Sequence, residues 1–323
     1  MSIRAKAPAL ILPALTAFLL SACGTEPDPV AEVPAFPVDV ARVDVIESGQ
    51  DPQVLAYDDI TDDQAKGQEG ASSRTAEVEN GFAQNVVAAN AVDRAASPVT
   101  NIDTLALPLE VRTVEAPAPG EGETEATRRV QLTVGQALHS GTDIVQEIDS
   151  AAGFLSMWRG TNDGRVSTIK LLAPAEASED ARAAVESGLL SVLTGTVIFP
   201  GEPVGVGGSW TVESRVTGGS TMLRTTTYTV TDIVGTEVSL EVSIDQRPAQ
   251  ETLNFDGEQA PQLAGQSLTV ESSDTSSAGS IVVDLTEALP VAGRVTTSTR
   301  VIYAGADDNF RIVQDQTQSI DWS

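Results

Sequence analysis

The sequence predicts a mainly β protein of the α+β class: a curved antiparallel sheet, or half-barrel, covered by one helix near residues 178–193. Three observations lead to this prediction. Apolar and polar residues alternate through much of the C-terminal half, residues typical of turns separate the alternating runs, and one segment has a clear helical period. Side chains two apart share a face of a strand, whereas those three and four apart share a face of a helix.

The N-terminal part of the predicted domain contains strand patterns. Short runs with alternating valines lie between Val38 and Tyr57, and a longer run extends from Leu105 to Val114. We therefore expect at least part of residues 38–124 to join the sheet. Pro108 lies in the longer run and predicts an edge position or a bend, because proline has no N–H to donate to a neighbouring strand.

Two other segments of this part are not predicted to be strands. Residues 116–124 are rich in proline and glycine and are expected to form a loop. Residues 81–96 carry apolar side chains at helical spacing, which predicts a short helix there. The side chains in question are Phe82, Val86, Val87 and Ala91.

The covering helix is expected from Ser178 to Leu193. Ser178 is a favourable N-cap, the two acids that follow it suit the positive end of the helix dipole, and Gly195 can end the helix. A sheet with one apolar face needs a second layer to cover it, so the apolar stripe of this helix is expected to line a cavity against the sheet. The stripe consists of Val185, Leu189, Val192 and Leu193.

The C-terminal half predicts an antiparallel meander. In Glu237 to Asp245 every second residue is apolar, which gives the strand one dry and one wet face. Turns that contain Gly, Asp or Pro separate most of the neighbouring candidates. These further strands are expected at Ser220–Val230, Ser267–Glu271, Ser280–Leu285, Arg294–Tyr303 and Phe310–Ile320.

The stretch from Phe199 to Val212, FPGEPVGVGGSWTV, has a physical reading of its own. Pro203 stiffens a turn, while Gly205 and Gly207 permit positive φ. Val206 and Trp210 are then expected to dock the start of a strand against the core. The stretch lacks the lysine and the strand-to-helix order of a phosphate-binding loop.

The same stretch resembles the P-x-x-P-V-x-V-G-x-S-W signature of several uncharacterised families of bacterial lipoproteins. The later run from Leu289 to Gly293, LPVAG, is similar to a turn in those families, and the resemblance covers roughly residues 125–320. It implies no catalytic residue. The layout of these families, a curved antiparallel sheet with a helical cover, is similar to that of the LolA-like lipoprotein carriers, and such a likeness concerns the fold alone.

The N-terminus predicts export. Arg4 and Lys6 precede an apolar run that is shorter than a membrane span and is interrupted by prolines. The run ends in Leu-Ser-Ala before Cys23, the single cysteine of the chain, and this resembles the lipobox of bacterial lipoproteins. The resemblance implies that residues 1–22 are a signal peptide, that Cys23 carries a diacylglyceryl group, and that these acyl chains hold the protein at the exported face of a membrane. Gly24, in place of Asp, implies the outer membrane if the cell has one.

The mature chain is expected to divide into a linker and a domain. Residues 23–37 are rich in proline and acids and form a flexible linker, which spans roughly 40 Å if it is extended. Residues 38–323 form a single β-rich domain. If that domain is subdivided, the boundary is expected near residues 116–125.

The composition excludes nucleic acid as a partner. The chain has 19 Lys and Arg against 46 Asp and Glu, a net charge of −27, which repels phosphate backbones. No cofactor or metal site is predicted. His139 is the only histidine and lies in a turn-like context, and Asp58, Asp59, Asp62 and Asp63 lack the spacing of a calcium loop.

Three functions remain open from the sequence. The protein is expected not to be an enzyme but to bind an apolar ligand or lipid in the concave face of its sheet. The first alternative is an envelope or protein-interaction module with a filled core, and the second is a hydrolase whose site is not recognisable. A long cavity between sheet and helix favours the first function, and a tightly packed interface favours the module.

Overall fold

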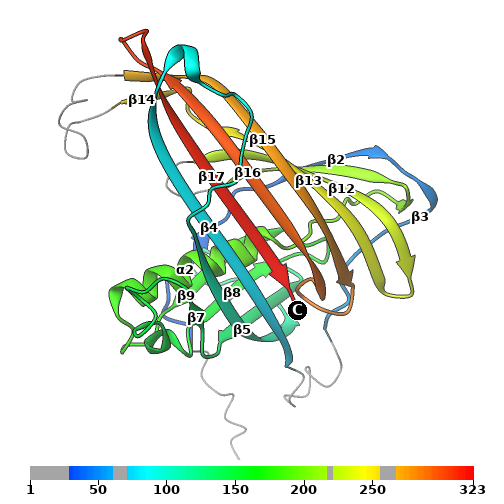
Figure 1. Ribbon diagram of the computed structural model, residues 1–323. Coiled ribbons are helices and arrows are strands. Elements are labelled where there is room, and N and C mark those ends of the chain that lie inside the picture. Colours follow the sequence, from blue (N-terminus) through cyan, green and yellow to red (C-terminus); the bar gives the residue numbers. More distant parts are fainter. Residues whose placement is uncertain (1–28, 61–70, 217–220, 255–266) are drawn as a thin grey trace, which may run out of the picture.

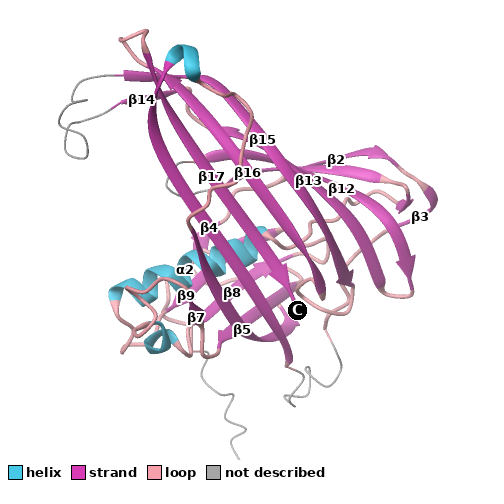
Figure 2. Cartoon of the chain, viewed as in Figure 1, coloured by secondary structure: helices cyan, strands magenta, loops and turns pink. Residues whose placement is uncertain are grey.

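The computed structural model describes residues 29–60, 71–216, 221–254 and 267–323. These residues form one large antiparallel sheet, which does not close on itself, and a single α-helix, α2 (Glu179–Thr194). Figures 1 and 2 show the sheet curving around α2. The predicted class, mainly β with one covering helix, is therefore confirmed. The signal peptide, Cys23 and Gly24 lie outside the described residues.

The sheet joins both halves of the chain. Its order is β1-β9-β8-β6-β5-β4-β17-β16-β15-β13-β12-β11-β2, with β7 beside β5 and β14 beside β15, while β3 and β10 pair separately. The strands are β1 (Phe36–Pro37), β2 (Arg42–Glu47), β3 (Gln50–Gln53), β4 (Ser72–Ala88), β5 (Ile102–Glu115), β6 (Arg128–Val134), β7 (Leu138–His139), β8 (Leu155–Gly160), β9 (Val166–Leu172), β10 (Val204–Val206), β11 (Ser209–Val216), β12 (Met222–Val234), β13 (Glu237–Pro248), β14 (Thr252–Asn254), β15 (Ser267–Asp284), β16 (Ala292–Ala304) and β17 (Phe310–Trp322).

The predicted meander is present, and the N-terminal strands extend it. From β11 to β17 the large strands follow one another in sequence order, and β4 and β5 then continue the sheet beyond β17. Part of residues 38–124 joins the sheet, as expected. Residues 116–125 connect β5 to β6, which are neighbours in it. Ser267–Glu271 and Ser280–Leu285, expected as two strands, lie at the two ends of a single strand, β15, which stops at Asp284.

The short helix expected at 81–96 is wrong. β4 covers the first half of this segment and pairs with β17 from Ala76 opposite Trp322 to Ala88 opposite Phe310. A 3₁₀ turn, η1 (Ala89–Ala91), follows. The pattern misled because side chains four apart share a face in a strand as well as in a helix. Pairing with β17 supplies ladder hydrogen bonds to the backbone of this part of β4.

Pro108 is not on an edge strand, since β5 lies between β4 and β6. It stands where the partner of β5 changes: β7 pairs with Leu105 and Ala106, and β6 pairs from Leu109 onward. The carbonyl oxygen of Pro108 accepts a hydrogen bond from Gly135 N at 2.8 Å. The missing N–H therefore falls at a break in the ladder, where a central strand tolerates proline.

The helix α2 begins and ends as predicted and packs very close to the sheet. Ser178 accepts a hydrogen bond from Ala181 N at 3.3 Å, and Gly195 follows the last turn. At Gly188 an added Cβ would lie 2.7 Å from a methyl group of Leu105. A side chain at this crossing of α2 over β5 would require the leucine side chains below it to shift, because protein interiors are closely packed.

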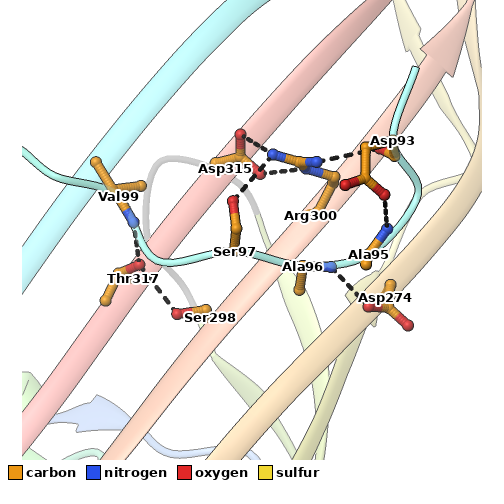
Figure 3. A network of polar contacts seen from close by, with 10 residues as sticks. All are labelled: Asp93, Ala95, Ala96, Ser97, Val99, Asp274, Ser298, Arg300, Asp315 and Thr317. Atoms are coloured by element: carbon orange, nitrogen blue, oxygen red, sulfur yellow. Dashed lines mark hydrogen bonds and ion pairs between the residues drawn. The ribbon is translucent and has the colours of Figure 1, made fainter. Parts of the chain in front are cut away.

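A strap crosses the other face of the sheet. Between the 3₁₀ turn at Ala89–Ala91 and β5 the chain runs over β16 and β17 (Figure 1) and is held by polar contacts that Figure 3 draws. Arg300 forms a two-bonded ion pair with Asp315, at 2.7 and 3.0 Å, and also binds Asp93 O and Ser97 Oγ. The register puts these side chains out of phase with those facing α2. The strap therefore buttresses the sheet from behind.

Candidate ligand-binding groove

A groove of about 590 Å³ lies between α2 and the concave face of the sheet. Its walls come from β1, β4, β9, β11, β12, β13, β15, β16, β17 and the exposed flank of α2, so it spans most of the width of the sheet. Its volume falls within the roughly 300–1,000 Å³ typical of small-molecule sites. Leu190 on α2 and Phe36 on β1 line it and are exposed.

The part of the groove floor nearest α2 is apolar. Register places one row of side chains across the sheet there, because residues opposite each other on paired strands share a face. The helix flank adds Leu190 and Leu193, and β9 adds Ile169 and Leu171. The row consists of Tyr228, Val242, Val295, Ile320 and Val78.

Two residues farther along each strand, the concave face becomes polar. Thr226, Thr297, Gln318 and Asn80 occupy the next row of the groove, in which Ile244 is the apolar member. One row beyond, Arg224 faces the groove opposite Gln246 on β13. The lining is therefore amphipathic, with an apolar floor under the helix and a polar band beside it.

Arg224 is the inward-facing cation of this band, while Arg215, an exposed residue of β11, also lines the groove. Its Nη2 donates to Gln318 Oε1 at 3.1 Å and to Gln246 Oε1 at 3.4 Å, and its Nε is buried without a hydrogen-bond partner. Burial lowers the pKa of Arg224, because the charged form is separated from water. Burial disfavours the charged form of the neighbouring Tyr228 as well; for a phenol this raises the pKa, to about 12, so the side chain is neutral.

The residues predicted to line a cavity lie on two sides of α2. Val185, Leu189 and Val192 are completely buried in the main core. Leu193 alone of the four lines the groove. Most of the apolar stripe therefore covers the sheet and does not line the groove. The groove is lined by the adjacent flank of the helix, and because this flank contains polar residues, a search for apolar periodicity did not identify it.

The Phe199–Val212 motif combines closely packed residues with exposed ones. Gly207 has φ +78°, and an added Cβ at Gly205 would lie 1.9 Å from Gln50 O. Trp210 is fully buried, as expected, and donates from Nε1 to Ile198 O at 2.9 Å. Val206, expected to dock against the core, is exposed. Pro203, which precedes β10, is exposed as well.

Trp210 belongs to a row of aromatic rings beneath the groove. Centroid separations are 5.3 Å from Tyr57 to Phe199, 5.9 Å from Phe199 to Trp210 and 5.3 Å from Trp210 to Tyr228. Tilted and stacked ring contacts of this kind add to the stability that burial gives. Because Tyr228 also lines the groove, this row links the motif to one wall of the site.

The other polar residues considered from the sequence lie apart from the groove. His139 accepts a hydrogen bond at Nδ1 from Gly141 N at 2.9 Å. Asp59 is buried and pairs with Arg128 at 3.3 Å; burial raises its pKa while Arg128 opposes the rise. Asp62 and Asp63 lie outside the described residues. Among the residues the structure describes, no three His, Cys, Asp or Glu side chains gather as a metal site would need.

The sequence pattern contained a signal for Arg224 that the prediction did not use. In β12 the inward positions are Met222, Arg224, Thr226, Tyr228 and Val230. An arginine in phase with buried apolar side chains is unusual, because burying a charge is costly unless it is paired.

Comparison with protein-family models and with curated proteins gives no match to this chain. Within the described part of the chain, α2 included, no helix has both the length and the apolar character of a membrane span.

Proposed function

We propose that this protein is an exported, lipid-anchored lipoprotein that binds an apolar ligand or lipid without catalysing a reaction. The observation that carries the proposal is the groove of about 590 Å³ between α2 and the sheet, with its apolar floor. Burying hydrocarbon there is favourable by about 0.8 kcal/mol for each CH₂ removed from water. Exposed Leu190 and Phe36 at the groove give an apolar chain a first contact.

The proposed anchor supports this function by position. A diacylglyceryl group on Cys23 provides more than one acyl chain, which is what stable membrane attachment requires. The acidic domain does not bind an anionic surface by charge, since the whole chain carries a net charge of −27. The anchor therefore holds the groove close to lipid without fixing the domain flat on the headgroups.

A protein-interaction module with a filled core is the second candidate. The tight seam between α2 and β5, where Gly188 meets Leu105, favours it. Under this alternative the groove holds water or a partner's side chains and no lipid accompanies the protein.

Native mass spectrometry of the full-length protein, extracted in mild detergent, distinguishes the two candidates. We expect a ligand-bound species whose extra mass is a lipid or another apolar molecule. Ser187→Trp, which fills the groove from α2, is expected to remove the adduct. Ala183→Trp, at an exposed position of the same helix that does not line the groove, is expected to keep it. Adduct-free protein from repeated preparations would favour the interaction module.

A further inference from the structure

Arg224, a half-buried residue, differs from three other arginines of the described structure that are buried or half-buried. Arg128, Arg159 and Arg300 each pair with a carboxylate, at 3.3 Å (Asp59), 3.4 Å (Glu123) and 2.7 Å (Asp315). Arg224 has no carboxylate at ion-pair distance among the described residues; its hydrogen-bond acceptors are two neutral amides. In a chain with 46 acidic residues, this arginine is thus held away from all of them in the described part of the fold.

A guanidinium in this setting is suited to an oxyanion from outside the protein. An arginine presents Nε and one Nη as a fork that binds two oxygens of a carboxylate or phosphate at once. In Arg224 the buried Nε has no partner, while Nη2 makes contacts of 3.1 and 3.4 Å to amide oxygens. An anion at this edge would supply the missing acceptor and the missing charge, and desolvation strengthens such a pair.

The surroundings of Arg224 define the rest of the ligand. Thr226 and Thr297 add hydroxyl groups to the same wall, and the apolar row begins one step closer to α2. The acids that line the groove, Glu186 and Asp39, belong to α2 and to the segment after β1, and Glu186 has Arg182 at 3.8 Å. An anion is therefore favoured on the β12 wall, with its tail toward the helix.

We infer that the groove binds an amphiphile with an anionic headgroup, a carboxylate or a phosphate, and that Arg224 binds this headgroup. The inference rests on the proposed function and names the class of ligand. Charge and geometry together make Arg224 a specificity-determining residue, because a neutral headgroup of the same size would leave the guanidinium unpaired.

Competition against a neutral fluorescent probe, N-phenyl-1-naphthylamine, tests the inference. The protein is the chain without residues 1–23, which retains every described residue. Competitors are dodecanoate, dodecyl phosphate and dodecanol, all below their micelle concentrations. We expect the better anion to bind at least about tenfold more tightly than dodecanol, the size expected for a hydrogen-bonded charge. The two anions separate carboxylate from phosphate as the preferred head.

Variants assign the effect to Arg224. In Arg224→Gln the preference for the anions is expected to disappear while the affinity for dodecanol is retained, and in Arg224→Lys part of the preference remains. Arg247→Gln removes an equal charge from an exposed residue on the adjacent strand, opposite Leu223, and should keep the preference. Thermal unfolding verifies that each variant is folded.

The outcomes separate this inference from the proposed function. If wild-type protein binds dodecanol as tightly as both anions, or if Arg224→Gln keeps the preference in a folded protein, Arg224 does not bind the headgroup, although the groove still takes an apolar chain. If the probe and all three competitors fail to bind, the proposed function fails as well.

Discussion

At the scale of single residues, the fold depends on two kinds of position. At the first kind there is no room for a side chain, and at the second a charged group needs partners of opposite charge. Gly205 illustrates the first kind. An added Cβ would meet the backbone oxygen of Gln50 at 1.9 Å, and a backbone atom cannot turn aside as a flexible side chain can. Gly201, in the same motif, has open space around the position of its Cβ and no positive φ.

Gly205→Ala is therefore expected to destabilise the protein by about 1–3 kcal/mol or more, the range of overpacked sites. Gly201→Ala is expected to change stability by less than about 0.5 kcal/mol. The midpoint of urea unfolding for each variant measures the difference. Equal midpoints for the two variants would mean that β10 and β3 can move apart without a loss of stability, which would contradict the prediction.

Glu123 illustrates the second kind of position. It lies 2.9 Å from Lys170 Nζ and 3.4 Å from Arg159 Nη1 and accepts a hydrogen bond from Gly120 N. Burial by itself raises the pKa of Glu123, but these hydrogen bonds and charges outweigh it and hold the pKa below its ordinary value. The cluster ties the 116–124 loop to β8 and β9.

A lowered pKa makes this contribution pH-dependent. Glu123 binds a proton less tightly in the folded state than in the unfolded state. The stabilisation is therefore complete above about pH 4.5, the ordinary pKa of a glutamate, and is lost as the pH falls below the lowered pKa of the folded state. Glu123→Gln should be less stable than wild type at neutral pH, with the gap narrowing in acid. Urea unfolding across this pH range measures the gap, and exposed Glu121→Gln is the control. A constant gap would contradict the role assigned to the charge.

At the scale of elements, α2 has two functions on two flanks. Its fully buried residues, Val185, Leu189 and Val192, hold it to the sheet, and the flank with Leu190 and Leu193 borders the groove. The helix is therefore both the cover of the core and one wall of the site. Neighbouring leucines on it are expected to respond differently to truncation.

Leu189→Ala leaves a cavity in the core and is expected to cost about 2–5 kcal/mol of unfolding free energy. Leu190→Ala, at a residue 37% exposed, is expected to leave stability nearly unchanged but to weaken binding of N-phenyl-1-naphthylamine. Thermal unfolding and probe titration on both variants check this. Loss of stability without loss of binding in Leu190→Ala would place the site elsewhere.

At the scale of the whole molecule, one open sheet carries the groove on its concave face and a strap on the opposite face. Arg300 and Asp315 fasten the strap behind β16 and β17, the strands that supply Val295, Thr297 and Ile320 to the groove (Figure 3). Under the proposed function a tether at Cys23 is all that attaches this body to a membrane.

Cys23→Ala is accordingly expected to move the protein from the membrane fraction to the soluble fraction. The reason is that the acyl chains contribute essentially all of the membrane affinity of so acidic a chain. Fractionation of cells followed by immunoblotting measures the shift, and Ser21→Ala, which keeps the thiol, is the control. Retention of Cys23→Ala at the membrane would contradict the proposed anchor.

The sequence by itself determined the fold class, the meander and the helix α2 with its cap at Ser178, because these depend on local periodicity and on the chemistry of helix ends. It predicted a helix at 81–96 where the structure has part of β4, since spacing of four residues suits helix and strand alike. It also predicted the burial of Trp210, whose size and place before a strand suffice for that prediction.

Tertiary structure alone decided where the groove lies and what lines it. Arg224, Gln318 and Leu190 are far apart in the chain, and their meeting depends on β4 joining β17 and on α2 lying inside the curve of the sheet. Pairing between distant strands is set by the packing of the whole chain rather than by any local pattern. A polar band across an otherwise apolar face becomes visible only when the register of all the strands is known.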